Sequence, residues 1–246
     1  MSNHVYFVSD IHLGVPDRQS SLKREKKLVR WLDSVGQNAT EIIILGDLFD
    51  FWFEYRQVVP KGYVRLLGKL AELSDQGIQI HMFRGNHDMW MFKYLQEEMG
   101  VKMYSDEWET SWDGKRFFIH HGDGLGPGDR TYKVLRKLFR NKLAQELFRW
   151  IHPDLGMKVA NYFSKRSRLA NENREEVFDE PNEWLLQFCK AKEAKEHFDF
   201  YIFGHRHLAL DIPFAESSRY MNLGEWVSDN RYAYWNGKEL QLLQYE

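Results

Sequence analysis

The chain has 246 residues, of which 43% are hydrophobic and 15% aromatic, and its formal net charge is −2. This composition excludes a disordered chain, and the length fits one main domain that carries an insertion better than two equal domains. No uninterrupted apolar run approaches the roughly 20 residues that a membrane-spanning helix requires, which argues against an integral membrane protein.

No charged leader, apolar segment or cleavage site precedes the first strand-like run, which begins at His4. The single cysteine, Cys189, has no partner for an internal disulfide, and its partly apolar helical setting predicts a packed thiol. We therefore expect a cytoplasmic protein, and we expect any contact with a membrane to be peripheral.

Three runs of β-branched and aromatic residues, Val5–Val8, Glu41–Leu45 and Ile78–Phe83, alternate with helical patterns from the start of the chain. Continuous apolar strands of this kind are covered by helices on both faces, so we expect a layered α/β fold. Later, Asp113-Gly114 and Asn236-Gly237 are hairpin signals next to strand-like residues, which indicates that the sheets are mixed.

Between Gly124 and His197 the strand pattern stops and amphipathic helical periodicity replaces it. Because strand-like residues resume at Phe198, we expect a catalytic body of residues 1–123 and 198–246, interrupted by a helical cap at residues 124–197. The cap is strongly basic: residues 130–168 contain eleven Lys or Arg and two acidic residues, which gives +9 and leaves −11 for the remainder.

Five short polar clusters follow strand-like runs. Ligands bind α/β sheets at the carboxyl ends of strands, so these clusters should meet at one edge of the sheet. Glycine in four of them lets the backbone turn sharply and approach a ligand closely. The clusters are Asp10-Ile11-His12, Gly46-Asp47-Leu48-Phe49-Asp50, Gly85-Asn86-His87-Asp88, His120-His121-Gly122-Asp123 and Gly204-His205-Arg206-His207.

The clusters offer carboxylate, imidazole and amide ligands but no thiolate, a set that favours Mn²⁺, Fe or Zn²⁺ over a soft metal or a Ca²⁺ cage. A lone Asp-x-His or His-x-His is more often ordinary polarity, whereas five clusters after five strands indicate a metal centre. Two ions about 3.5 to 4 Å apart activate a water and neutralise charge on a phosphoryl oxygen. One ion would take Asp10, His12, Asp47 and His207, and the other Asp47, Asn86, His121 and His205, so that Asp47 bridges them.

His87 is not needed to complete either ligand set. We predict that it contacts the phosphoryl oxygens or protonates the leaving group, and that Asp88 orients it. Asp50 and His120 are expected to support the ligands or the fold.

The order of these clusters resembles the calcineurin-like metallophosphoesterase superfamily, and the resemblance spans Asp10 to His207. It implies a metallophosphoesterase-type fold, a layered β-sheet sandwich flanked by helices, and a phosphoesterase that uses two divalent ions, with Mn²⁺ expected first. The superfamily includes phosphatases, nucleases and diphosphatases, so this resemblance alone leaves the substrate open.

The stretch 46–52 and the insertion after His121-Gly122-Asp123 resemble more narrowly the UDP-2,3-diacylglucosamine diphosphatase family of lipid A biosynthesis. This resemblance implies hydrolysis of the diphosphate to UMP and 2,3-diacylglucosamine 1-phosphate (lipid X), at the cytoplasmic face of the inner membrane. The best-known family members carry Arg in place of His87 and Lys in place of Arg174. The implied substrate-binding residues are Asn86, His87, Asp129, Ser167, Asn171, Arg174 and His205, and positions 167, 171 and 174 share one helical face.

The basic cap has three interpretations. As a lid, it would place cations on the diphosphate and on anionic headgroups, while its apolar faces line a slot for acyl chains or dock on a membrane. As a plain helical pair, it would pack its apolar stripe on the body. As a nucleic-acid surface, it would bind phosphates, although the acidic remainder of the chain argues against this.

Two alternative functions remain at this point. One is a metallophosphoesterase that acts on a different nucleotide, phosphodiester or nucleic acid. The other is a non-catalytic scaffold with the same fold, which is disfavoured because no ligand position is missing. The native metal, the acyl-chain preference and the oligomeric state are left open.

Overall fold

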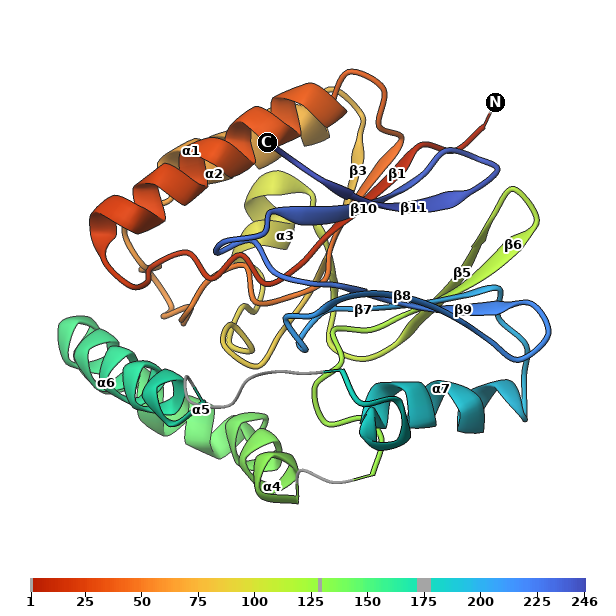
Figure 1. Ribbon diagram of the computed structural model, residues 1–246. Helices are drawn as coiled ribbons and strands as arrows, with labels where there is room; N and C mark the ends of the chain where they lie inside the picture. The colour runs from red at the N-terminus through yellow and green to blue at the C-terminus, as the bar shows by residue number, and fades with distance from the viewer. Residues whose placement is uncertain (1, 128–129, 172–177) are drawn as a thin grey trace.

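The computed structural model describes residues 2–127, 130–171 and 178–246, without the side chains of residues 130–132 and 165–171. Within this part of the chain two β-sheets lie face to face (Figure 1). The first has the strand order β11-β10-β1-β2-β3-β4, and the second has the order β5-β6-β7-β9-β8. Strands β1 to β4 are parallel neighbours, as are β6, β7 and β9. The pairs β1–β10, β10–β11, β5–β6 and β8–β9 are antiparallel, so each sheet is mixed.

The strands are short. Those of the first sheet are β1 (Val5–Val8), β2 (Glu41–Ile44), β3 (Gln79–Phe83), β4 (Lys102–Tyr104), β10 (Arg231–Trp235) and β11 (Leu240–Gln244). Those of the second sheet are β5 (Trp108–Trp112), β6 (Lys115–Ile119), β7 (Phe200–Phe203), β8 (Ala209–Phe214) and β9 (Ser218–Leu223). The predicted strands and both predicted hairpins are confirmed, since β5 and β6 flank Asp113-Gly114 and β10 and β11 flank Asn236-Gly237.

Helices cover both outer faces of the sandwich (Figure 1). The first sheet carries α1 (Arg18–Val35), α2 (Val64–Asp75) and α3 (Tyr94–Met99), and the second carries α7 (Trp184–Glu193), which follows the short 3-10 helix η1 (Glu180–Asn182). Three more helices lie to one side of the sandwich (Figure 1): α4 (Arg130–Phe139), α5 (Lys142–Arg149) and α6 (Pro153–Asn171). We call α4, α5 and α6 the cap helices.

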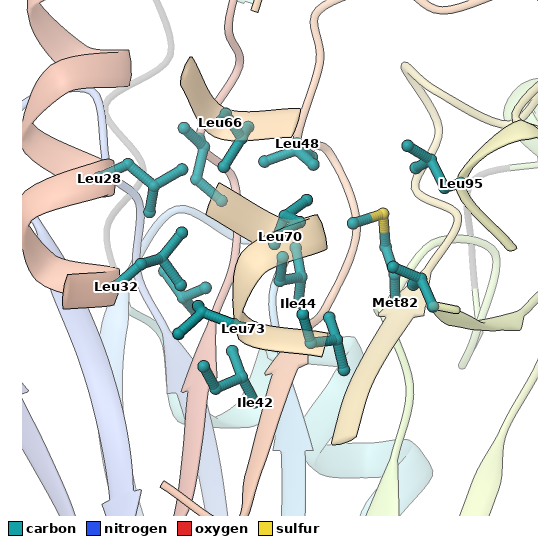
Figure 2. Close-up of a cluster of buried hydrophobic side chains, with 14 of the residues drawn as sticks. Leu28, Leu32, Ile42, Ile44, Leu48, Leu66, Leu70, Leu73, Met82 and Leu95 are labelled. Carbon is teal, nitrogen blue, oxygen red and sulfur yellow. The ribbon is translucent and has the colours of Figure 1, made fainter. Parts of the chain in front are cut away.

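The core follows the two-residue period of the strands. In β1, Val5 and Phe7 pack between the two sheets, whereas Tyr6 and Val8 pack toward the helices. Figure 2 shows the helix side, where leucines of α1 and α2 meet Ile42 and Ile44 of β2. Each such aliphatic side chain contributes about 1.5–3 kcal/mol when it is fully buried, so the two sheets and their helices form a firm support for the strand ends.

Helix α7 differs from the expected domain division. Its Leu185, Leu186 and Cys189 are buried against Phe118 and Tyr201 of the second sheet. It therefore packs as part of the body, although its residues lie inside the range 124–197 that was expected to form the cap. The predicted packing of the Cys189 thiol is confirmed. No helix among the described residues is long and apolar enough to cross a membrane.

Candidate metal centre

The strand ends bring the five polar clusters to one edge of the sandwich, which we call the metal edge. Asp10, Asp47 and Asn86 follow the parallel strands β1, β2 and β3, while His121 and His205 follow the parallel strands β6 and β7. Backbone hydrogen bonds tie neighbouring clusters together, for example His12 N to Asp47 O at 2.9 Å and Gly204 N to His121 O at 2.9 Å. All seven predicted metal ligands therefore lie in one place.

The ligand atoms of Asp10, His12 and His207 form one group, in which all lie within 4.8 Å of one another. Nε2 of His207 is 3.2 Å from Nε2 of His12 and 3.3 Å from Oδ1 of Asp10. Oδ2 of Asp47 approaches the same group, at 3.8 Å from Nε2 of His12. This is the first of the two predicted ligand sets.

The ligand atoms of Asp47, His121 and His205 form a second group of the same size. Oδ2 of Asp47 is 3.6 Å from Nε2 of His121, and Oδ1 of Asn86 is 3.2 Å from the same nitrogen and 2.8 Å from Nδ1 of His205. One carboxylate oxygen of Asp47 thus faces both groups, which is the arrangement that a bridging ligand needs. Nδ1 of His121 donates to Leu45 O at 2.5 Å, which leaves Nε2 as the free ligand nitrogen.

Each carboxylate has one oxygen held by the protein and one turned to the imidazoles. Oδ2 of Asp10 accepts from Ser9 Oγ at 2.5 Å and from His205 N at 2.9 Å. Oδ1 of Asp10 is fully buried, and no described residue gives it a hydrogen bond. Oδ1 of Asp47 accepts from His87 N at 2.9 Å. Because buried carboxylate oxygens require compensation, this donor set fits divalent cations.

The backbone at this edge is held in an unusual conformation. Of the nine described non-glycine residues with positive φ, five are predicted ligands: Asp10, His12, Asp47, His205 and His207. Such conformations are unfavourable for residues with a Cβ atom and cluster at functional sites. Glycine is required at position 85, because a Cβ there would overlap the Asp47 carboxylate.

Charge and burial set the protonation of the centre. Burial disfavours the charged form of His121, but the charges of Asp47 and Asp10 outweigh it and raise the pKa of His121 to about 10. Burial, aided by the charge of His121, lowers the pKa of His205 to about 4. Since metal ligands must be deprotonated, protons compete with cations at the Asp47–His121 pair.

His87 lies beside the first ligand group, with its ring 4.9 Å from that of His12. The prediction that Asp88 orients this ring is wrong. His87 Nδ1 donates to Asp50 O at 3.1 Å, while the buried Asp88 carboxylate accepts from the backbone amides of Leu48, Phe49 and Gly85. Burial and then the charge of Asp47 raise the pKa of Asp88 to about 7. Asp88 therefore holds two ligand loops together, and Asp50 orients His87.

The structure adds contacts between the cap helices and the body that the sequence analysis missed. Ser164 Oγ in α6 donates to Asp50 Oδ2 at 2.6 Å. The indole nitrogen of Trp90 donates to Phe139 O at 2.7 Å. Arg136 Nε lies 3.0 Å from Asp123 Oδ2. The first two pairs are 114 and 49 residues apart, the third is 13 residues apart, and no short motif marks any of them.

Four predicted substrate-binding residues cannot be placed against the metal ligands. Asp129 and Arg174 lie outside the described residues. Ser167 and Asn171 lie on α6, and their side chains are outside the description as well. Their roles therefore stay predictions, whereas Asn86, His87 and His205 stand at the metal edge.

The cap helices expose most of their large apolar side chains. Among the described residues, ten of the fourteen exposed large hydrophobic side chains belong to these helices, and an eleventh, Trp150, directly follows α5. Trp150 is 81% exposed and Tyr162 is 62% exposed. Phe148 is an exception, since its ring packs against two aromatic rings of the body. The ring centroids are 4.7 Å apart for Phe53 and 4.8 Å apart for Trp90. The interpretation of the cap as a plain helical pair packed on the body therefore explains Phe148. It does not explain the exposed apolar residues.

Comparison with known proteins agrees with this geometry. Residues 4–209 match the calcineurin-like phosphoesterase family. The chain belongs to this family, which confirms the predicted superfamily, the fold class and the assignment as a metal-dependent hydrolase.

Curated relatives have a more specific name. A UDP-2,3-diacylglucosamine hydrolase of Porphyromonas gingivalis is 40% identical over 98% of this chain and 97% of its own length. A protein of the same name from Yersinia pestis is 27% identical over 89% of this chain and 90% of its own. Among solved structures, a phosphoesterase from E. coli is 17% identical, with a TM-score of 0.45, and covers 94% of this chain and 87% of its own.

Proposed function

We propose that the protein hydrolyses the diphosphate of UDP-2,3-diacylglucosamine to UMP and 2,3-diacylglucosamine 1-phosphate. The observation that carries this proposal is the 40% identical relative of that name, which aligns over 97% of its own length. The complete ligand set and the helices beside it support the proposal. The alternative scaffold has no such support, because buried polar clusters of this kind are costly without a ligand.

The metal ligands and His87 have different roles in the reaction. A pair of divalent ions, Mn²⁺ first among the candidates, supplies Lewis acidity that activates water and offsets charge on the phosphoryl oxygens. Asp47 would hold both ions, with Asp10, His12 and His207 on one and Asn86, His121 and His205 on the other. His87, with Nδ1 bound to Asp50 O, presents Nε2 to the substrate, where it contacts a phosphoryl oxygen or protonates the leaving group.

The sugar side of the substrate would lie under α6. Ser164 faces the metal edge through its bond to Asp50, and positions 167 and 171 are three and seven residues further along the helix. Helical periodicity therefore places these positions on the same face as Ser164. We propose that Ser167 and Asn171, together with Asp129 and Arg174, bind the glucosamine and the diphosphate.

The cap helices would take the acyl chains and bring the enzyme to the membrane. Their exposed side chains include Leu138, Leu147, Trp150, Tyr162 and Phe163. Residues 130–168 add a charge of +9, and a basic helix with an exposed apolar face binds anionic bilayers. We therefore propose a peripheral enzyme of the cytoplasmic face of the inner membrane.

The test uses purified protein loaded with Mn²⁺ and UDP-2,3-diacylglucosamine in detergent micelles. We expect UMP release, and we expect phospholipid or detergent to stimulate it. A parallel reaction contains bis(4-nitrophenyl) phosphate, a small phosphodiester without a lipid. Hydrolysis of the small diester without UMP release would overturn the substrate and keep the metal chemistry. Competition by added polynucleotide would favour a nuclease instead.

A further inference from the structure

Arg206 stands between His205 and His207, which belong to the two different ligand groups. The backbone of both histidines is left-handed, with φ of 69° and 53°. This conformation persists at a residue with a Cβ atom only when surrounding contacts hold it. The loop therefore needs a support outside the ligand set.

A buried carboxylate provides such a support. Arg206 Nε lies 3.3 and 3.2 Å from Oε1 and Oε2 of Glu183, whose side chain is 1% exposed. The Arg206 guanidinium also lies 4.3 Å from the ring centroid of Trp184. The Tyr220 hydroxyl donates to Glu183 Oε1 at 3.4 Å. Because a planar guanidinium fits both a carboxylate and an aromatic face, these contacts fix Arg206 in one orientation.

Both connections of the cap reach the same point. Glu183 and Trp184 lie at the start of α7, after the cap helices. On the outgoing side, a Cβ at Gly126 would lie only 2.5 Å from the carbonyl oxygen of Trp184, so the two connections are in contact. Lys133 Nζ in α4 donates to Gly126 O at 2.7 Å. The support of the metal loop is thus built where the chain leaves and re-enters the body.

We propose that Glu183, Trp184 and Arg206 form a positioning cluster that holds His205 and His207 in ligating geometry. The inference rests on the proposed metal centre and adds a role for residues outside the ligand set. Its signature is specific: His205 and His207 serve different ions, so disturbing Arg206 should weaken both ions at once. Changing a ligand of only one group, such as His12, should weaken mainly one.

The experiment titrates Mn²⁺ into the intact protein and follows binding by electron paramagnetic resonance. Arg206→Gln alone would leave the Glu183 carboxylate buried without its cation, which can unfold a protein. The main variant is therefore Glu183→Gln with Arg206→Gln, which removes both charges. We expect both ions to bind about 10- to 100-fold more weakly, as for other residues that orient ligands. Excess Mn²⁺ should restore part of the activity, and Arg206→Lys should show an intermediate loss.

The matched control is Asp211→Asn with Arg219→Gln, which removes another carboxylate–guanidinium pair. Its residues lie on β8 and β9 of the second sheet. Arg219 Nε lies 3.0 Å from Asp211 Oδ1, and its guanidinium lies 5.8 Å from the ring centroid of Phe200, away from the ligand loops. This control should bind Mn²⁺ as the wild type does. Weakening of one ion only, no weakening, or equal weakening in the control would overturn the positioning role. If the unmodified protein binds Mn²⁺ but releases no UMP, the proposed substrate is wrong and this inference still stands.

Discussion

The metal edge and the cap helices are built in opposite ways. At the metal edge, Asp10, His12, Asp47 and His121 are at most 1% exposed, and the second oxygen of each carboxylate is already hydrogen-bonded. In the cap helices, large apolar side chains face outward, and α5 buries none of its residues. The first region holds its side chains in fixed positions, whereas the second leaves an apolar surface exposed, which we propose receives the acyl chains. Substitutions should therefore have different consequences in the two regions.

The largest effect is expected from Asp47→Ala. One oxygen of this side chain faces both ligand groups, so its loss should release both ions and lower kcat/KM by about 1,000-fold or more. Metal content by mass spectrometry and UMP release measure the two losses together. Wild-type turnover, or loss of a single ion, would contradict the shared-ligand arrangement. Asp33→Ala, at an exposed position of α1, is the control.

His87→Gln should separate acid catalysis from metal binding. We expect kcat to fall about 100-fold, the lower range for a lost proton donor, with two ions still bound. His87→Arg keeps an N–H donor but cannot release a proton, so it should lose less only if His87 contacts a phosphoryl oxygen. The measurement is kcat for UMP release beside metal content. Loss of an ion in the Gln variant would make His87 a ligand rather than a donor to the substrate.

Two tryptophans compare the regions directly. Trp150 is 81% exposed on the cap and Trp31 is fully buried in α1. Trp150→Ser should change the free energy of unfolding by no more than about 0.5 kcal/mol, yet raise KM for the lipid substrate several-fold. Trp31→Ser should cost about 3–5 kcal/mol of stability.

Thermal denaturation and micellar kinetics measure both tryptophan variants. If Trp150→Ser unfolds as readily as Trp31→Ser, the exposed cap surface is a packed core after all. If it leaves lipid kinetics unchanged, that side chain does not meet the substrate.

Ser164→Ala should give the smallest effect. It removes one hydrogen bond between α6 and Asp50, which is worth about 1 kcal/mol, so KM should rise about five-fold. Metal content should not change. Ser20→Ala, which removes the hydrogen bond from Ser20 Oγ to Asp17 Oδ2 in the first turn of α1, is the control. A fall in kcat without a rise in KM would show that Ser164 acts on the chemistry instead of on the cap.

The sequence predicted the metal edge well because that edge is made of local signals. Each ligand follows a strand that its own apolar run identifies, and parallel pairing then brings the strand ends together without further information. The contacts that depend on distant residues were missed. Glu183 and Arg206 are 23 residues apart and meet through the packing of α7, and Ser164 meets Asp50 across 114 residues.

The role of Asp88 was assigned incorrectly for a related reason. Adjacency in the sequence suggested that Asp88 serves His87, but the chain bends at residues 86–88 and the two side chains have different partners. The structure sends Asp88 to the backbone of Leu48 and Phe49, about 40 residues earlier in the chain. The extent of the cap was overestimated because α7 has the same helical pattern as the cap helices, and only its burial against the second sheet distinguishes it.

Strands β6 and β7 lie side by side, although the whole insertion separates them in the chain. Ile119 pairs with Ile202, and His121 O accepts from Gly204 N at 2.9 Å. The cap helices leave and return at adjacent points, since a Cβ at Gly126 would lie 2.5 Å from the carbonyl oxygen of Trp184, and the cost of closing such a loop grows only slowly with its length. The body can accept insertions of quite different size here while its ligands stay in register. An exchange of the cap helices at this junction would alter the surface beside the ligands and keep the strands that carry them.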